Sequence, residues 1–258
     1  MMDGLLKGKR IVIIGGTSGI GWAAAQAFLT QGAKVVAMGL AVDDLVEQDG
    51  LAFHLGDARL EGISEAAIRK CVALFGGFDA LFHVAGGSGR KWGDGPLHEL
   101  TLAGWQQTFD LNLTSMMLSN QAAVRYFLAK AQKGSILNIS TVLAYSPSPK
   151  FFYTHAYAAA KAAVIGFSTS LAAYYAAHDI RVNVLAPALT DTPMAQRAGQ
   201  RTDIQHFIKT KQPLAGGRMA SPDDLTGAAT YFLSDAAGFT TGQVLAVDGG
   251  WSVSEGQY

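Results

Sequence analysis

Tyr157 and Lys161 are the two residues of this sequence whose types and spacing best suit chemistry. Three alanines separate them, and because alanine is the strongest helix former, the segment is expected to be helical. On a helix, residues four positions apart lie on one face, one turn from each other. A nearby ammonium favours the phenolate and lowers the tyrosine pKa from its usual ~10, which would make the phenol a general acid and base. A four-residue pattern is short, so its meaning depends on the elements that position it.

A glycine-rich turn near the start of the chain predicts a phosphate-binding loop. The β-branched run Arg10 to Ile14 leads into a G-x-x-x-G-x-G turn and then into the helical pattern Trp22 to Thr30. Glycines permit a tight turn and close approach of a pyrophosphate, and a helix N-terminus supplies free N–H groups. The spacing differs from the commonest dinucleotide fingerprint, but the order strand, turn, helix is the required one. The candidate cofactor-binding residues of this turn are Gly15, Thr17, Ser18, Gly19, Ile20 and Gly21.

The end of the second predicted strand, Ala33 to Met38, bears on the choice between NAD and NADP. An acidic residue at this place binds the ribose 2′-hydroxyl of NAD, whereas a nearby arginine accommodates the 2′-phosphate of NADP. The chain continues with Gly39-Leu40-Ala41-Val42 and has no arginine or lysine between Val35 and Gly56, which favours NAD over NADP. Asp43 has two interpretations, contact with the ribose hydroxyls or a helix cap.

The other elements alternate along the chain. Strands are expected at Leu51 to Leu55, Asp79 to Val84, Ser135 to Ser140, Ile180 to Leu185 and Val244 to Val247. Helices are expected at Ser64 to Phe75, about Ala103 to Ala131, His155 to His178, and Pro222 to Ser234. Ser64 and Ser221 are the expected caps of the first and last of these helices. This alternation predicts an α/β fold, a single-domain Rossmann fold over residues 1–258 with a doubly wound parallel sheet of about seven strands flanked by helices on both faces. The irregular segment Ala195 to Arg218 stands where a lid would be, so a lid is expected at about 189–218.

Small and polar residues follow several strands at their carboxyl ends, the edge where open α/β sheets bind ligands. Asp57 is placed to accept a hydrogen bond from an adenine amino group, and Ala85-Gly86 allows close approach of a flat cofactor. Ser140-Thr141 brings two hydroxyl groups to the same edge. Asn112 lies within an apolar helical pattern, so its amide needs a partner, either a backbone carbonyl or a bound water.

Composition favours a small molecule as partner and the cytoplasm as location. The chain has 20 basic and 20 acidic side chains, so charge gives no reason to expect binding of nucleic acid or of an anionic membrane. Its one cysteine, Cys71, excludes an intramolecular disulfide and fits a reducing compartment. We see neither a long apolar run nor the apolar core of a signal peptide, so no membrane partner is expected.

Taken in order, these motifs resemble the classical short-chain dehydrogenases/reductases over nearly the whole chain. The glycine turn Gly15 to Gly21 is similar to that family's glycine motif, Ala85-Gly86 to the end of its Asn-Asn-Ala-Gly motif, and Tyr157 with Lys161 to its catalytic pair. Val247-Asp248-Gly249-Gly250 resembles its C-terminal signature. The cofactor contacts that the resemblance implies include Gly39, Asp57, Ala58, Ala85, Gly86, Tyr157, Lys161, Pro187, Thr190 and Thr192.

The resemblance also implies a mechanism. Tyr157 would protonate a ketone oxygen or deprotonate an alcohol while a hydride passes to or from the nicotinamide. Lys161 would lower the tyrosine pKa and hold the nicotinamide ribose, and Asn112 would anchor a water that relays protons. The implied protein is an NAD(P)-dependent oxidoreductase of a secondary alcohol and a ketone, and a homotetramer. Long helices with apolar or small residues on more than one face independently predict a homo-oligomer.

Departures from the family pattern keep alternatives open. Thr141 stands at the position of the catalytic serine, and Ser140, Ser146 and Ser148 are alternatives for that role. His83-Val84 replace the usual pair of asparagines, and we interpret His83 as a hydrogen-bonded core residue with no metal site nearby. These changes motivate a second hypothesis, a catalytically weak NAD(H)-binding sensor or scaffold on the same fold.

Basic residues outside the motifs have two interpretations, an anion-binding role for the substrate or ordinary solvated loops, and the second is preferred. They are Arg90, Lys91, Arg197, Arg201, Lys209 and Lys211.

Overall fold

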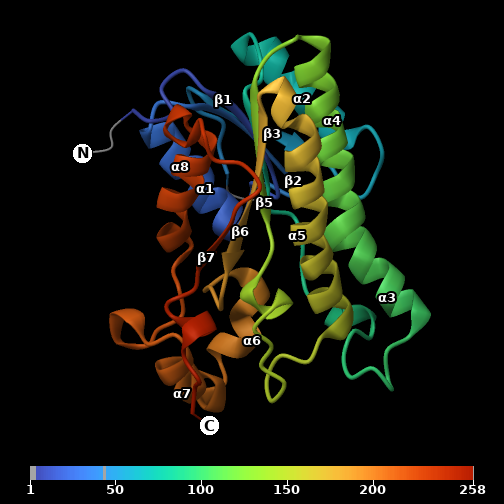
Figure 1. Ribbon diagram of the computed structural model, residues 1–258, viewed down its shortest axis with the longest axis vertical. Helices are drawn as coiled ribbons and strands as arrows, with labels where there is room; N and C mark the ends of the chain where they lie inside the picture. The colour runs from blue at the N-terminus through green and yellow to red at the C-terminus, as the bar shows by residue number, and fades with distance from the viewer. Residues whose placement is uncertain (1–3, 43–44, 258) are drawn as a thin grey trace.

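A seven-stranded parallel sheet runs through the computed structural model, which describes residues 4–42 and 45–257 (Figure 1). The strand order is β3-β2-β1-β4-β5-β6-β7. The order reverses direction between β1 and β4, and in such sheets ligands bind beyond the carboxyl ends of the strands at this point. The strands are β1 (Arg10–Ile14), β2 (Lys34–Gly39), β3 (Leu51–Leu55), β4 (Ala80–His83), β5 (Gly134–Ile139), β6 (Ile180–Pro187) and β7 (Val244–Val247).

Helices cover both faces of the sheet, as Figure 1 shows with α1 and α8 on one side and α2, α4 and α5 on the other. The predicted α/β fold with a doubly wound sheet is therefore confirmed. The helices are α1 (Gly19–Thr30), α2 (Ile63–Phe75), α3 (Leu102–Phe109), α4 (Ser115–Ala129), α5 (His155–Tyr175), α6 (Gln196–Gly199), α7 (Thr202–Lys211) and α8 (Thr226–Leu233).

Burial on both faces explains why the central strands are continuously apolar. Side chains alternate across a strand, so Ile11 and Ile13 of β1 pack with α1 and α8, whereas Val12 and Ile14 pack with α2 and α4. All four are fully buried. Cys71 of α2 lies in the second of these clusters, as a core residue.

The expected long helix from Ala103 to Ala131 is interrupted. A π-helical segment, Asp110–Thr114, separates α3 from α4. Two side chains in this region donate hydrogen bonds to backbone carbonyl groups. Asn112 Nδ2 donates to the Thr108 carbonyl over 2.8 Å, and Ser115 Oγ donates to the Leu111 carbonyl over 2.7 Å. These substitute donors explain how the wider turn is tolerated within a helical pattern.

Two further predictions about helices were wrong. Gly62, in a left-handed conformation, begins α2, whereas Ser64 lies inside the helix. The segment from Ala195 to Arg218 is largely helical instead of irregular, because Ile204, Phe207 and Ile208 of α7 follow helical spacing and are buried in a small separate core. Ser221 does act as a cap, within a capping box at the short 3₁₀ turn Pro222–Leu225 that precedes α8.

By length and composition, one helix within the described ranges, His155–His178, could cross a membrane. It comprises α5 and a 3₁₀ turn, Ala176–His178. In this fold it packs against the sheet and buries the side chain of Lys161, as the core helix of an α/β domain does.

Candidate active site

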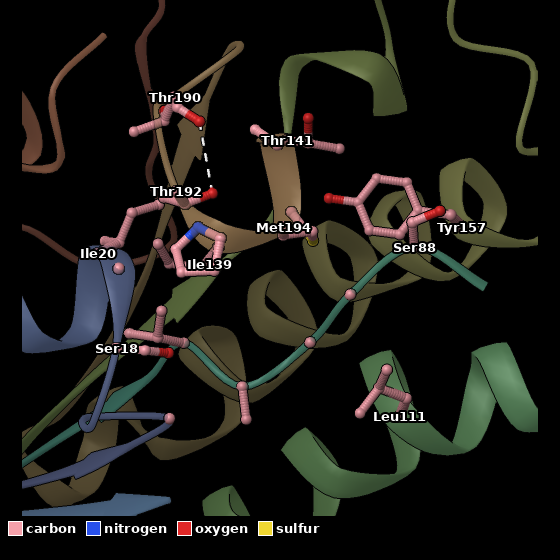
Figure 2. A pocket seen from close by; sticks show the side chains of 18 of the residues that line it. Ser18, Ile20, Ser88, Leu111, Ile139, Thr141, Tyr157, Thr190, Thr192 and Met194 are labelled. Carbon is pink, nitrogen blue, oxygen red and sulfur yellow. Dashed lines mark hydrogen bonds between the residues drawn. The ribbon is translucent and has the colours of Figure 1, made fainter. Parts of the chain in front are cut away.

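A cavity of ≈ 950 Å³ lies at the carboxyl ends of the strands. It extends from the glycine turn before α1 to Trp251 near the end of the chain. Figure 2 shows side chains from both halves of the sheet that face this space, among them Ser18, Thr141 and Thr192. Apart from the alternative serines and basic residues, the residues predicted for the site line it, except Gly21 and Asn112.

Gly15 and Gly21 shape the turn between β1 and α1. Gly15 has a φ of +84°, and a side chain there would meet the backbone nitrogen of Ala85 at 2.6 Å. A side chain on Gly21 would lie 1.9 Å from the Gly15 carbonyl oxygen. Gly21 therefore serves the close packing of helix and turn, which brings the neighbouring residues to the cavity wall.

The N-terminus of α1 is suited to a pyrophosphate. Ser18, its N-cap, makes no side-chain capping bond, and the first turn holds no acidic residue. The first N–H groups of the helix are thus left for a ligand, and they carry the partial positive charge of the helix dipole. Ser18, Gly19 and Ile20 line the cavity beside this turn, so the residues present fit a dinucleotide.

The far end of the cavity has the features expected for an adenosine, with one addition. Asp57 and Ala58 line the wall, and Arg59 forms an ion pair with Asp57 at 2.6 Å. The hydrogen bonds from Arg59 hold the pKa of Asp57 below its usual range. Leu40 and Ala41 occupy the corner after β2, while Asp43, the alternative ribose contact, lies outside the described residues.

Thr141 and Tyr157 are paired at the opposite end. Thr141 follows β5, and its hydroxyl donates to the Pro187 carbonyl over 3.3 Å while lying near enough to the Tyr157 phenol to lower the pKa of that phenol. Figure 2 shows the phenol oxygen pointing into the cavity toward Thr141. Burial raises the pKa of Tyr157 to about 12, and the neighbouring Thr141 hydroxyl offsets part of that rise. The prediction that Lys161 lowers this pKa below 10 is not met in this arrangement, because burial outweighs it.

Lys161 lies one turn after Tyr157 and is buried. Its ammonium donates to the Ile139 carbonyl over 3.0 Å and lies 6.0 Å from the centre of the Tyr157 ring. Burial lowers the pKa of Lys161 to about 8. An ammonium has three donors, so two remain to be directed at a ligand in the cavity that this residue lines.

The alternative serines are placed differently from Thr141. Ser140 lines the cavity, but its hydroxyl donates to the Lys161 carbonyl over 2.7 Å and is buried. Neither Ser146 nor Ser148 lines the cavity. The Ser146 carbonyl instead accepts a hydrogen bond from the Trp251 indole.

Asn112 holds the backbone that follows β4. Its amide donates to the Gly87 carbonyl over 2.9 Å and accepts from the Gly87 N–H over 3.0 Å. Of the two partners that the sequence left open, backbone carbonyls satisfy the amide group. Asn112 thereby fixes the wall next to Gly86 and Lys161.

His83 is a buried, hydrogen-bonded core residue, as predicted. Its Nδ1 lies 2.8 Å from Ser119 Oγ, and its Nε2 lies 3.1 Å from the Ala85 carbonyl. Burial, together with the charge of Lys161, lowers the pKa of His83 to about 3. The ring is therefore neutral at physiological pH and ties α4 to the end of β4.

Several lining residues come from parts of the chain with no recognisable motif. Arg90 and Trp92 belong to a 3₁₀ turn, Gly89–Trp92, after β4. Arg197 lies on α6, and Trp251 follows β7. Of the basic residues outside the motifs, for which the solvated interpretation was preferred, Arg90, Lys91 and Arg197 line the cavity, whereas Arg201, Lys209 and Lys211 do not. Trp92 and Trp251 had no such signal in the sequence, because each reaches the cavity through the packing of segments that are distant in sequence.

Comparisons with known sequences agree with this geometry. A family model of short-chain dehydrogenases/reductases, described as Enoyl-(Acyl carrier protein) reductase, matches residues 15–252. The cis-4-hydroxycyclohexanecarboxylate dehydrogenase of Sinomonas cyclohexanicum is 36% identical over 248 residues, which cover 93% of this chain and 95% of that protein. The 2,5-dichloro-2,5-cyclohexadiene-1,4-diol dehydrogenase of Sphingobium indicum is 34% identical over 258 residues, which cover 96% of this chain and 98% of that protein.

Solved structures give the same result. A gluconate 5-dehydrogenase from Burkholderia cenocepacia, in complex with NADP and tartrate, matches with a TM-score of 0.86 at 27% identity, covering 97% of this chain and 98% of that chain. A 3-ketoacyl-(acyl-carrier-protein) reductase from Brucella melitensis, complexed with NADH, matches with a TM-score of 0.83 at 28% identity, covering 96% of this chain and 100% of that chain. With the family model covering most of its length, the chain belongs to the short-chain dehydrogenase/reductase family of oxidoreductases.

Proposed function

We propose that this oxidoreductase interconverts a secondary alcohol and a ketone, with Tyr157 as the general acid and base. The observation that carries the proposal is the Tyr157 phenol that faces the Thr141 hydroxyl in a cavity that also contains a phosphate-binding turn. A nicotinamide dinucleotide in this cavity would supply or accept the hydride.

The chain's own residues divide the remaining work. Tyr157 gives its proton to the carbonyl oxygen in reduction and takes it back from the alcohol in oxidation. The Thr141 hydroxyl takes the serine role and donates to the same oxygen, since it already faces the phenol. Lys161 would hold the ribose hydroxyls of the cofactor with its two remaining donors, and its charge favours the phenolate in oxidation.

We propose NAD as the preferred cofactor. Leu40 and Ala41, which line the corner after β2, are uncharged, and Arg59, the cation that lines this end of the cavity, is engaged by Asp57. A 2′-phosphate would have to compete with that carboxylate. We expect kcat/KM for NAD to exceed that for NADP by at least about tenfold, since one unpaired charge contact is worth ~1.5–3 kcal/mol. A preference for NADP that Arg59→Leu removes would overturn this choice.

Absorbance at the reduced nicotinamide band tests the activity. The protein is mixed with NADH and a panel of ketones, and Tyr157→Phe is measured alongside. We expect turnover by the wild type and its loss in the variant, with binding of NADH retained. Ketone reduction by Tyr157→Phe would refute the assigned mechanism.

The same experiment addresses the alternative of a sensor or scaffold. That hypothesis rested on Thr141 and on His83. Thr141, however, still places a hydroxyl group near the phenol, and His83 is a core residue whose ring nitrogens are hydrogen-bonded. The observed departures thus leave the proposed chemistry intact. Tight NADH binding without turnover on a broad panel would favour the sensor instead.

We also propose a homotetramer. Apart from the buried Lys161 and the terminal His155, α5 carries no ionisable side chain other than tyrosine, and its exposed positions are small or uncharged. Exposed apolar side chains also occur in β7 and in the segments before and after it, among them Phe239, Leu245 and Val253. A tetramer needs two kinds of interface, and the uncharged face of α5 and the exposed apolar side chains in and near β7 would supply them. Light scattering should give about four times the 27.2 kDa of one chain, and a monomer would contradict the proposal.

For location we propose the cytoplasm, with a small molecule as the partner in place of a membrane or nucleic acid. Cys71 is buried, and burial raises the pKa of its thiol to about 12, so the one thiol of the chain is unreactive. Cell fractionation tests the location, and recovery with the membrane pellet would contradict it.

A further inference from the structure

The cavity carries an excess of positive charge that the reaction does not use. Arg59, Arg90, Lys91, Lys161 and Arg197 line it, whereas Asp57 is the single acidic residue on its wall within the described ranges. The chain as a whole has no net charge. Arg59 is neutralised by Asp57, and Lys161 is fixed beside the phenol. The charge that remains belongs to Arg90, Lys91 and Arg197.

Arg90 lies at the end of the cavity where the chemistry takes place. Its 3₁₀ turn is fastened to the N-terminus of α5, because Asp94, just after that turn, accepts hydrogen bonds from the backbone N–H groups of Ala156 and Tyr157. The Arg90 guanidinium lies 5.2 Å from the centre of the Tyr153 ring, four residues before Tyr157. The adenosine end is at β2 and β3, on the other side of the reversal point of the sheet.

Arg90 is half-buried, and none of Arg90, Lys91 and Arg197 forms an ion pair in the described part of the chain. Burial, and next the charge of Arg197, lower the pKa of Arg90, so the two guanidinium groups are close enough to repel each other. Tyr153 and Asp94 offset part of this effect, but the Asp94 carboxylate is already engaged by two backbone N–H groups. Lys91 instead points its ammonium over the Trp92 ring at 4.4 Å. Two like charges held together with no ion-paired acid in the described ranges suit an anionic ligand.

The wall between this charge and the phenol is apolar. Leu143, Phe152, Met194 and Trp251 line the cavity, and Figure 2 shows Met194 beside the space in front of the Tyr157 phenol. A ligand that fills this end would therefore place an apolar body against these side chains and its charge at the arginines.

We propose that the substrate is a compact apolar secondary alcohol or ketone that carries a carboxylate at the end remote from the reacting carbon, and that Arg90 binds this carboxylate with Arg197 as a second cation. The inference rests on the proposed alcohol/ketone function, because it names the substrate of that same site. A carboxylate matches the planar fork of a guanidinium in a bidentate contact.

The test compares keto acids with their methyl esters, which differ in charge and little in shape. The panel covers cyclic, linear and aromatic bodies, for example 4-oxocyclohexanecarboxylate, each measured with NADH. We expect kcat/KM for at least one acid to exceed that of its ester by about 10- to 100-fold. Arg90→Met should remove this preference, mainly through KM, while the ester is reduced as before, and Arg90→Lys should restore part of it.

The matched control is Lys209→Met, which removes a basic residue of the neighbouring α7 that does not line the cavity. It should leave the acid preference unchanged. If Arg90→Met impairs acid and ester equally, Arg90 has a structural role only and the proposal is wrong. Preference for a neutral thioester of a carrier over every keto acid would also overturn it.

Binding measured without turnover separates this proposal from the function on which it rests. Calorimetry with Tyr157→Phe and NADH reports affinity for acid and ester where no reaction occurs. Selective binding of an acid, lost in Tyr157→Phe/Arg90→Met, with no turnover in the wild type, would retain the carboxylate site and refute the oxidoreductase function. Turnover of esters together with equal binding of acids and esters would retain the oxidoreductase function and refute the carboxylate site.

Discussion

Asp94 and Tyr157 are joined by a hydrogen bond of 2.9 Å from the backbone N–H of Tyr157 to the Asp94 carboxylate. The second carboxylate oxygen accepts from the N–H of Ala156 over 3.0 Å. Thr154, the N-cap of α5 in sequence, makes no side-chain capping bond. A buried carboxylate some sixty residues earlier thus caps the helix that carries Tyr157, and its charge suits the helix N-terminus.

Removal of this cap should affect both stability and turnover. Asp94→Ala leaves two N–H groups unpaired, so the free energy of unfolding should fall by about 2 kcal/mol and kcat by about tenfold or more as Tyr157 shifts. Asp94→Asn keeps one acceptor oxygen, so its stability and its kcat should lie between those of Asp94→Ala and those of the wild type. Asp224→Ala removes the capping carboxylate next to α8 and should cost stability alone. If kcat per folded molecule is the same in Asp94→Ala as in the wild type, the cap does not position Tyr157.

The Thr141 hydroxyl should be required for turnover, whereas its methyl group should not. Thr141→Val keeps the shape but removes the donor, and kcat should fall by about 10²- to 10³-fold, as for loss of one hydrogen-bond donor to a developing oxyanion. Thr141→Ser should remain within about tenfold of the wild type. If Thr141→Val is active and Ser140→Ala is not, the serine role belongs to Ser140.

The buried Lys161 ammonium should destabilise the native state at neutral pH, and this destabilisation should decrease as the pH rises. Burial lowers its pKa from 10.5 to about 8, so between these values the unfolded chain binds a proton that the native state has lost. Native stability contributed by this group therefore rises with pH across that window. At pH 7, Lys161→Met should be inactive but more stable than the wild type. The gain in the free energy of unfolding should be at most about 3 kcal/mol, reduced by the loss of the hydrogen bond to Ile139.

Thermal unfolding of this variant and the wild type at pH 7 and pH 10 measures the effect. The stability difference should narrow at the higher pH, because the native lysine is then uncharged. A difference that widens with pH would contradict the assigned direction of the pKa.

His83 should make the protein sensitive to acid. Its pKa falls from 6.5 in the unfolded chain to about 3 in the native state, so stability from this group is present above pH 6.5 and is lost as the pH falls toward 3. Between pH 6.5 and 5 the wild type should lose about 2 kcal/mol more than His83→Asn. Urea unfolding at the two pH values measures this loss, and parallel losses in both proteins would disprove the prediction.

The sheet and the cofactor end of the site could be predicted because local residues determine them. β-branched runs such as Arg10 to Ile14 form strands that are buried on both faces, and the turn Gly15 to Gly21 has close contacts that glycine alone permits. Thr141 and Asp57 could be placed because the carboxyl ends of parallel strands share one edge.

The substrate end could not be predicted in the same way. Arg90 and Asp94 lie in a glycine-rich loop whose sequence is typical of a turn, and the α5 cap that fixes this loop joins residues far apart in the chain. Arg197 was part of a segment expected to be irregular, although α6 and α7 form there around buried Ile204. The Tyr157 pKa was also assigned from one neighbouring charge, whereas burial dominates it.

The π-helical segment Asp110–Thr114 places α3 and α4 out of phase. An α-helix turns about 100° per residue, so one additional residue rotates the second helix by about that angle relative to the first. The apolar stripes of the two helices then face different neighbours, although the sequence between them reads as one continuous helix. The segment therefore has the geometry of a straight helix with one residue too many, and the amide of Asn112 bonds to Gly87 from within this wider turn.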